Sequence, residues 1–154
     1  MSCPCSNPPS GLGRGCDNSA ATGGAILSAT GAASLSADSL VFHTSGEKPT
    51  ALSILTQWTG SSATGTVFGM GVRCASGTFE RLYSKSASGG SITAPNLGAG
   101  DPSVSARAAA LGDTILPGQD RWYLVYYRDP IVLGGCPAAS TFNATQTGRV
   151  VWSP

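Results

Sequence analysis

Turn-forming residues interrupt this chain roughly every 8–12 residues from position 23 onward, and this spacing is the strongest limit on the folds open to it. The interruptions include SGEKP, TGSSATG, SASGGS, APNLGAGDP and LPGQD. Between them lie short runs in which apolar and polar residues alternate, as in a β-strand with one buried face. No apolar stripe with the period of a helix persists. The pattern predicts an all-β fold, an antiparallel β-sandwich of Greek-key or jelly-roll type with roughly seven to ten strands.

The chain divides into two parts. Residues 1–22 are rich in Pro, Gly, Ser and Asn and have no periodicity, which indicates a cysteine-bearing N-terminal loop that disulfides staple. Residues 23–154 are expected to form a single β-sandwich domain, because 154 residues are enough to bury a substantial core in one unit.

The segment RWYLVYYRDP predicts the central strand, because both of its alternating faces are aromatic or aliphatic. We expect Trp122, Leu124 and Tyr126 to face the core. The turn LPGQD before it is typical of a late strand in Greek-key sandwiches, where a tyrosine hydroxyl can return to the backbone of the preceding turn. Tyr123 is the candidate for that role, with simple packing as an equal alternative.

Two other segments carry local signals. SVSARAAA, with Val104 expected inward, is interpreted as a strand followed by a turn, although its composition also permits a helical turn. Gly69 and Gly71 interrupt the apolar run GTVFGMGVRC, which indicates a bulge or a close backbone approach.

Charge is scarce in this sequence. Only 11% of residues are charged, with 9 Lys and Arg against 8 Asp and Glu, whereas about a quarter is usual for a globular protein. This balance argues against nucleic acid or an anionic membrane surface as a partner. No segment predicts a membrane span. A polar, uncharged surface is typical of secreted β-proteins, and with no signal peptide after Met1 we expect an extracellular domain in mature or excised form.

The residues give little support for an enzyme. His43 is the only histidine and is expected to be a partly exposed strand residue without a catalytic role, although a Ser-His-Asp or Cys-His site would have to use it. No G-x-S-x-G or H-E-x-x-H motif is present. Nearly all the acids lie in turns, where they usually cap their own backbone. We expect no catalytic residue and no cofactor.

The cysteines raise the question of a metal or of disulfides. Cys3, Cys5 and Cys16 could hold zinc with a fourth ligand, but the C-x-C spacing is not the usual one and no histidine lies nearby. A calcium site at CDNS or GAGDPS is a further alternative with a generic motif. No metal is predicted, and disulfides are favoured.

Five cysteines allow many pairings, and we expect two bonds. Cys5–Cys16 would restrain a loop that has almost no apolar surface of its own. Cys74–Cys136 would tie the end of GMGVRC to the loop LGGCPAAS, which leaves Cys3 free or bonded outside the chain. Exchange of Cys3 for Cys5 in the first bond is the nearest alternative.

Several motifs together suggest a family. The string CPCSNPPSGLGRGCDNS, then FGMGVRCASGTFERL, ILPGQDRWYLVYYRDP and CPAASTFNATQTGRVVWSP follow one another through nearly the whole chain. In this order they resemble a C-terminal domain of secreted proteins from planctomycetes and other large-genome bacteria. The resemblance implies an all-β extracellular module without a defined activity. It also implies that a further cysteine lies upstream of Cys-Pro-Cys in related domains, so that Cys3 has lost its partner; an intermolecular disulfide is the alternative.

Three functions remain as hypotheses. The first is a non-catalytic module for binding or surface attachment, with a glycan or cell-surface partner; Trp58 and Trp152 would supply its ligand-facing rings, although both could equally be core residues. The second is a structural subunit that self-assembles, because few Lys residues guard the strand edges. The third is a hydrolase that uses loop carboxylates.

Overall fold

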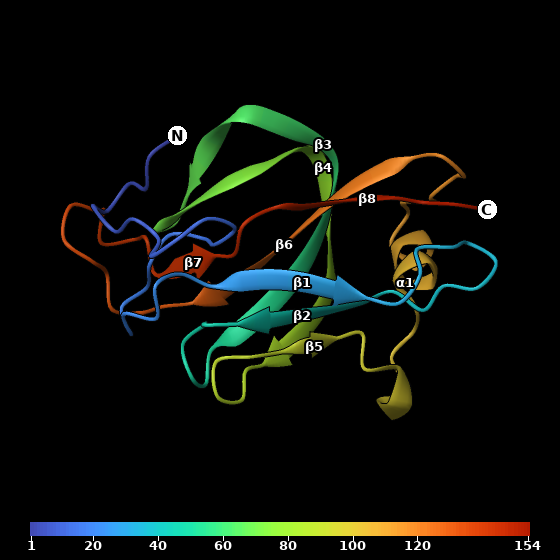
Figure 1. The fold of residues 1–154 in the computed structure, drawn as a ribbon, viewed down its shortest axis with the longest axis horizontal. Helices are drawn as coiled ribbons and strands as arrows, with labels where there is room; N and C mark the ends of the chain where they lie inside the picture. The colour runs from blue at the N-terminus through green and yellow to red at the C-terminus, as the bar shows by residue number, and fades with distance from the viewer.

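The computed structural model describes residues 1–154 and is built mainly from strands (Figure 1). The elements in chain order are β1 (Ile26–Thr30), β2 (Val41–Ser45), β3 (Leu52–Phe68), β4 (Gly71–Ser86), β5 (Thr93–Ala94), the 3-10 helix η1 (Leu97–Ala99), α1 (Val104–Ala110), β6 (Asp120–Arg128), β7 (Phe142–Ala144) and β8 (Gly148–Val151). The eight strands confirm the predicted all-β class.

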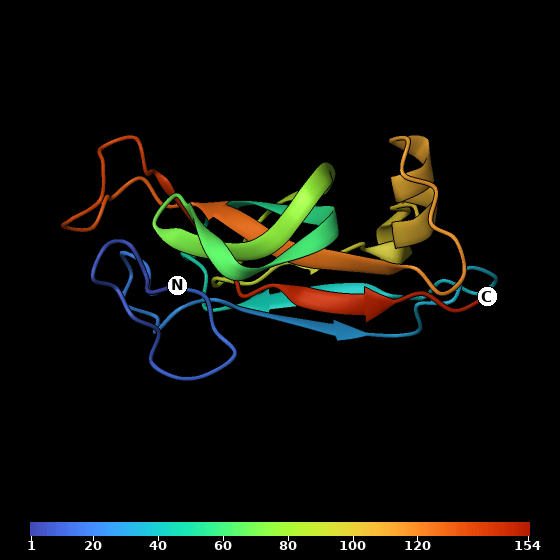
Figure 2. The same ribbon diagram turned by 90° about the horizontal axis from the view of Figure 1, so that it is seen from above.

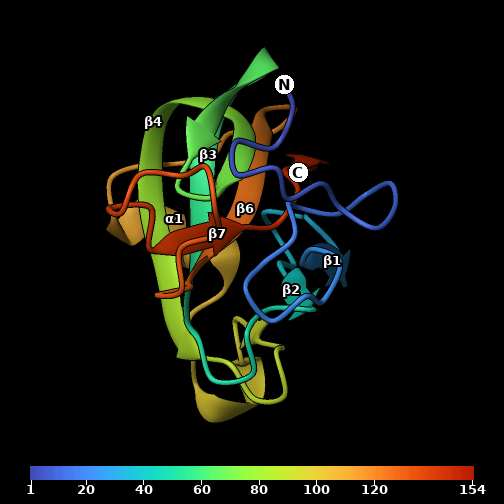
Figure 3. The same cartoon turned by 90° about the vertical axis from the view of Figure 1, so that its left-hand side faces the viewer.

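Two antiparallel sheets form the layers of a sandwich. The smaller sheet has the order β1-β2-β5, and the larger has the order β4-β3-β6-β7, with β8 also paired to β6. Figure 3 looks along the layers and shows β3, β4 and β6 on one side and β1 and β2 on the other. This arrangement confirms the predicted antiparallel sandwich.

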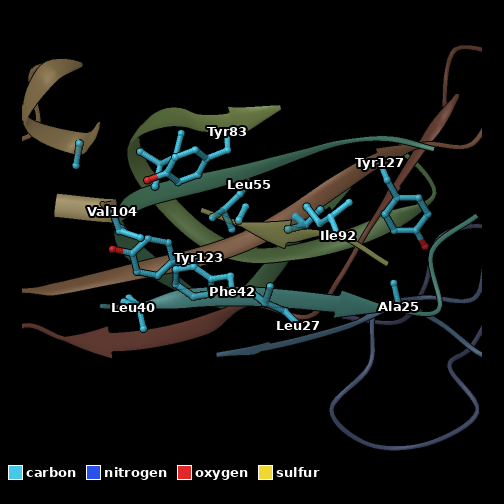
Figure 4. Packing of buried hydrophobic residues seen from close by; sticks show 14 of the residues in the cluster. Ala25, Leu27, Leu40, Phe42, Leu55, Tyr83, Ile92, Val104, Tyr123 and Tyr127 are labelled. Carbon is cyan, nitrogen blue, oxygen red and sulfur yellow. The ribbon is translucent and has the colours of Figure 1, made fainter. Parts of the chain in front are cut away.

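The main hydrophobic core lies between the two sheets. Phe42 of β2 packs against Tyr123 of β6, with ring centroids 4.6 Å apart (Figure 4). Leu40 and Thr44 are buried on the same side as Phe42, as the alternation in this segment predicts. The larger sheet supplies Leu55 and other buried side chains to the same cluster. The sandwich is therefore closed by ordinary inward-facing apolar residues from both layers.

The strand β6 is central, as predicted, because it pairs with β3 on one side and with β7 and β8 on the other. The prediction of its core-facing residues is wrong: Tyr123, Val125 and Tyr127 face the smaller sheet. Trp122, Leu124 and Tyr126 lie on the opposite face of the larger sheet, which we call the outer face. Both faces of β6 are apolar, so alternation separates the two sets without indicating which one the second sheet covers.

The hydroxyl of Tyr123 does not return to the preceding turn. It donates to Gln57 Oε1 at 2.7 Å and accepts from Trp152 Nε1 at 3.2 Å. Gln57 Nε2 in turn donates to Asp113, which is paired with Arg121. The predicted tyrosine corner is therefore wrong, and Tyr123 instead begins a buried polar network between β3, β6 and the C-terminal segment.

The hairpin of β3 and β4 bends sharply along its length (Figure 1). Its pairing register shifts at three places, including between Trp58 and Gly60, and such irregularities bend and twist a strand pair. The tip is a two-residue turn in which Gly69 has φ +63°. A side chain at Gly71 would meet Asn143 Oδ1 at 2.7 Å, which confirms the predicted close backbone approach. The bent tip thereby packs beside β7, where Met70 N donates to the carbonyl of Phe142.

The segment SVSARAAA forms the helix α1, so the prediction of a strand there is wrong. Ser103 caps the helix by accepting from Ala106 N, and Val104 and Ala108 are buried one turn apart. The Ala-rich sequence favours a helix once a capping residue precedes it. Neither this seven-residue helix nor η1 has the length and apolar character needed to cross a membrane.

The N-terminal segment and the loop before β7 lie at the end of the sandwich opposite α1 (Figure 2). One disulfide joins Cys3 to Cys16, and the other joins Cys5 to Cys136. The predicted Cys5–Cys16 bond is wrong, and its alternative with Cys3 is the one that forms. The predicted Cys74–Cys136 bond is also wrong: the unpaired thiol is Cys74, which is exposed on β4, and not Cys3.

Candidate functional site

Aromatic side chains gather on the outer face of the larger sheet. Trp58 and Phe68 come from β3, Phe79 from β4, Tyr126 from β6 and Phe142 from β7. Strand alternation directs Tyr126 outward from β6, and antiparallel pairing sets Trp58 opposite Phe79. The bend in the hairpin then brings Phe68 close to Tyr126, with ring centroids 5.6 Å apart.

The rings form two contacting groups. Trp58 and Phe79 stack with centroids 4.5 Å apart. Phe68, Phe142 and Tyr126 make edge-to-face contacts, with Phe68 and Phe142 5.0 Å apart. Offset stacking and edge-to-face contact are the arrangements that the ring quadrupoles favour.

Arg73 links the two groups of rings. Its guanidinium carbon lies 4.5 Å from the Trp58 ring centroid and 5.7 Å from that of Phe68. Arg81 lies 5.2 Å over Phe79, and its Nε donates to the hydroxyl of Tyr126 at 2.9 Å. These cation–π contacts and the hydrogen bond restrict where both guanidinium groups can sit.

Together these side chains line an open hollow of about 370 Å³. We call it the aromatic hollow, and its lining residues are Trp58, Val67, Phe68, Arg73, Phe79, Arg81, Tyr126 and Phe142. Two cations and no acid are present in this lining. Neither Arg73 nor Arg81 forms an ion pair, since the four ion pairs of the chain use other cations. The hollow is therefore apolar with an uncompensated positive charge.

The two predicted ligand-facing tryptophans have different positions. Trp58 lies in the aromatic hollow but is only 4% exposed, because Phe79 and Arg73 cover its ring. Trp152 is completely buried in the main core and donates to Tyr123, so its prediction as a ligand-facing residue is wrong. The reason is that Trp152 directly follows β8, where its backbone is bonded to Gln119 and Gly118 and its side chain enters the main core.

Sequence reasoning missed most of the aromatic hollow. Phe79 and Arg81 are recognisable as one face of the alternating segment TFERLYSK. Phe68 and Arg73 flank the FGMG turn, and their convergence with Phe142 depends on the hairpin bend and on the pairing of β7. Alternation could have suggested the first pair, whereas no local signal indicates the others.

Three other ionisable groups, His43, Asp113 and Glu47, are engaged in hydrogen bonds within the fold. His43 lies partly exposed on β2, as predicted, between Thr30 Oγ1 at 2.9 Å and Thr93 Oγ1 at 3.3 Å. Arg121 donates to Asp113 and holds the pKa of that carboxyl below its usual range. Burial raises the pKa of Glu47, although Ser53 donates a hydrogen bond to its carboxylate.

No three His, Cys, Asp or Glu side chains come together as a metal site requires. The three cysteines considered for zinc include two that are bonded to each other, Cys3 and Cys16. A second hollow of about 440 Å³ lies beside this disulfide, and the exposed Cys74 also lines it. Its lining combines short polar residues with Met1 and two prolines, without a convergent set of charged groups.

Comparisons with known proteins found no similar protein for this chain. No protein-family model matches it, and the searches of curated proteins and of solved structures returned no match. The resemblance to the planctomycete-type domain therefore stays a prediction based on its motifs.

Proposed function

We propose that this protein is a non-catalytic, extracellular binding module and that its aromatic hollow binds a carbohydrate. The observation that carries the proposal is an open cluster of aromatic rings on the outer face of a sheet whose other face already builds the core. Exposed apolar clusters with a few fixed polar groups are characteristic of ligand sites.

The chemistry of the hollow suits a sugar ring. The ring of a saccharide presents C–H bonds on its faces, which pack against an aromatic plane, and hydroxyl groups around its rim. Phe79 is 40% exposed beside Trp58 and Arg81, so part of its ring remains available for such a contact. Arg81 is exposed beside it and has hydrogen-bond donors in reach of a ring hydroxyl. A ligand can therefore gain apolar contact and hydrogen bonds in one place.

The acids of the chain support a non-catalytic role. Four of them, Asp101, Asp113, Asp120 and Asp129, are in ion pairs. Asp38 accepts from the backbone of Leu40 and Ser105, as a capping residue does. A glycoside hydrolase needs two free carboxyls facing each other across a cleft, and the aromatic hollow has none in its lining.

The extracellular assignment has separate support. The two disulfides, Cys3–Cys16 and Cys5–Cys136, are typical of oxidising compartments. They anchor the N-terminal segment, which contains no strand or helix before β1 begins at Ile26. A low charge content is also common on the surfaces of secreted β-proteins.

The test is a panel of neutral and acidic oligosaccharides, measured by glycan array and then by titration calorimetry. Phe79→Ala should weaken any binding at least tenfold, because it removes the most exposed ring of the hollow. Leu116→Ala is the matched control, since Leu116 is 55% exposed and lies outside the hollow. Binding that survives Phe79→Ala, or no binding to any saccharide, would contradict the proposal.

The same variant distinguishes self-association. If the aromatic hollow were an interface between copies, size-exclusion chromatography would show an assembly for the natural chain and a monomer for Phe79→Ala. We expect both to elute as monomers. A two-fold interface needs a surface that fits a copy of itself, and a concave patch does not fit another concave patch.

A further inference from the structure

We infer that the saccharide bound by the aromatic hollow is acidic and that Arg73 and Arg81 hold a carboxylate on its sugar ring. This inference rests on the proposed function and specifies its ligand. The class expected is a uronic acid, in which the carboxylate is attached directly to a sugar ring. The argument depends on the charge, the unused hydrogen bonds and the positions of the two arginines.

The positive charge of the aromatic hollow favours an anionic ligand. Its lining has two guanidinium groups and no carboxylate. Arg149 pairs with Asp120 and Lys85 with Asp101, whereas neither arginine of the hollow has an acidic partner. Two cations that line one hollow without an acid leave it positively charged, and this charge attracts an anion.

Both arginines keep most of their donors free. A guanidinium has five N–H donors. Arg81 uses its Nε toward Tyr126, and Arg73 uses Nη1 toward the carbonyl of Ala75 at 3.1 Å. Neither makes another hydrogen bond within the protein. Arg81 therefore presents both terminal nitrogens, and Arg73 presents one with its Nε, the geometry in which guanidinium groups bind carboxylates in a bidentate manner.

The guanidinium groups are already oriented. Arg73 is held over Trp58 and Phe68, and Arg81 over Phe79. Side chains that are fixed before binding lose less conformational entropy when the ligand arrives. The neighbouring rings also place apolar surface beside both guanidinium groups. A sugar ring that contacts the exposed part of Phe79 would bring its carboxylate to the hollow that both arginines line.

The experiment compares one saccharide in two charge states. Calorimetry is carried out with an oligogalacturonate and with the same oligomer after complete methyl esterification, which keeps the ring and removes the charge. We expect the acid to bind at least tenfold more tightly than the ester. Arg81→Gln and Arg73→Gln should each weaken binding of the acid more than binding of the ester, so that the preference for the acid is lost.

Arg128→Gln is the matched control for charge. Arg128 is exposed, forms no ion pair and lies outside the aromatic hollow. It should leave the preference for the acid intact. If Arg128→Gln lost the preference for the acid as fully as the two hollow variants do, the preference would be a general effect of charge and the inference would be overturned.

The remaining outcomes separate the two proposals. If acid and ester bind equally and Phe79→Ala abolishes both, the inference is overturned and the carbohydrate site stands. If neither oligomer binds and a wider saccharide array is also empty, the proposed function itself fails. Folding of each variant is checked by its near-ultraviolet circular dichroism, so that loss of binding is not mistaken for loss of structure.

Discussion

The two faces of β6 carry the same kinds of residue and are closed in different ways. On the inner face, Tyr123 and Tyr127 are fully buried beneath the smaller sheet. On the outer face, Trp122 and Tyr126 remain partly exposed around the fully buried Leu124. One face is covered by a whole layer of backbone and the other by a bent hairpin and two arginine side chains.

The difference is consistent with a strand whose inner face stabilises the fold and whose outer face carries the proposed binding site. The inner hydroxyls are satisfied by protein groups: Tyr123 contacts Gln57 and Trp152, and Tyr127 accepts from Asn18. On the outer face the hydroxyl of Tyr126 is engaged by Arg81, which is itself exposed. Groups covered by backbone are permanent parts of the fold, whereas groups beside an exposed arginine side chain remain accessible from solvent.

The largest expected effect comes from removing one large aromatic residue from each side of the larger sheet and comparing the losses in the free energy of unfolding. Trp152→Ala should reduce the free energy of unfolding by about 3–5 kcal/mol, because it leaves a cavity between the sheets. Phe79→Ala should cost only about 1 kcal/mol, since it loses one stacked contact at an exposed position. Urea unfolding measures both, and equal losses would break the distinction.

The next comparison removes a single hydroxyl from each face of β6. Tyr123→Phe leaves Gln57 Oε1 without its donor and Trp152 Nε1 without its acceptor, which should cost about 1–3 kcal/mol. Tyr126→Phe should cost less than about 0.5 kcal/mol, because water can replace the hydroxyl at the exposed Arg81. Thermal and urea unfolding of the two variants would contradict this comparison if the order were reversed.

A third prediction concerns pH and the buried carboxyl beside the inner face. Burial raises the pKa of Glu47 in the folded state, so the folded chain binds this proton more tightly than the unfolded chain. The resulting contribution to stability is fully present below the unfolded pKa and is lost as pH rises through the raised one. Glu47→Gln cannot ionise, and its amide oxygen can still accept from Ser53. Its free energy of unfolding should therefore rise relative to that of the natural chain as pH increases.

Asp113→Asn is expected to show the opposite dependence of stability on pH. The hydrogen bond from Arg121 lowers the pKa of Asp113, so that its contribution is present above the unfolded pKa and is lost as pH falls through the lowered one. The advantage of the natural chain over Asp113→Asn should shrink in acid. Urea unfolding at several pH values checks both variants, and parallel slopes would refute the two assignments together.

The smallest effect is expected on the outer side of the other sheet. His43→Gln should change the free energy of unfolding by less than about 0.5 kcal/mol, because His43 contacts only Thr30 and Thr93 at exposed positions. It should also leave saccharide binding unchanged, since it lies outside the aromatic hollow. A larger loss of stability would contradict this prediction, because it would mean that the outer side of the smaller sheet also stabilises the fold.

Several parts of the fold could be predicted from alternation and turn spacing. These include the sandwich class, the central position of β6, the shared face of Leu40 and Phe42, and the tight approach at Gly71. Each depends on residues close together in the chain, whose preferences act whatever the rest of the protein does. The helix α1 was missed because a short Ala-rich segment fits a strand pattern equally well until its capping residue is considered.

The candidate site was less accessible to such reasoning. Trp58 was recognised, but Arg73 and Phe68 enter the aromatic hollow only because the hairpin bends back toward β7. The disulfides show the same limit. Cys5 and Cys136 are 131 positions apart, and nothing local to either indicates that their Cα atoms come within 4.9 Å.

The sequence by itself therefore determined that the fold is an all-β sandwich and which residues of a strand share a face. Only the tertiary structure decided which face of β6 the smaller sheet covers, which cysteines pair, and where Trp152 lies. The physical reason is that alternation and turn preference are set by neighbouring residues, whereas burial and pairing depend on contacts across the whole chain. A strand that is apolar on both faces can be covered on either one, and the choice follows from how the rest of the chain packs.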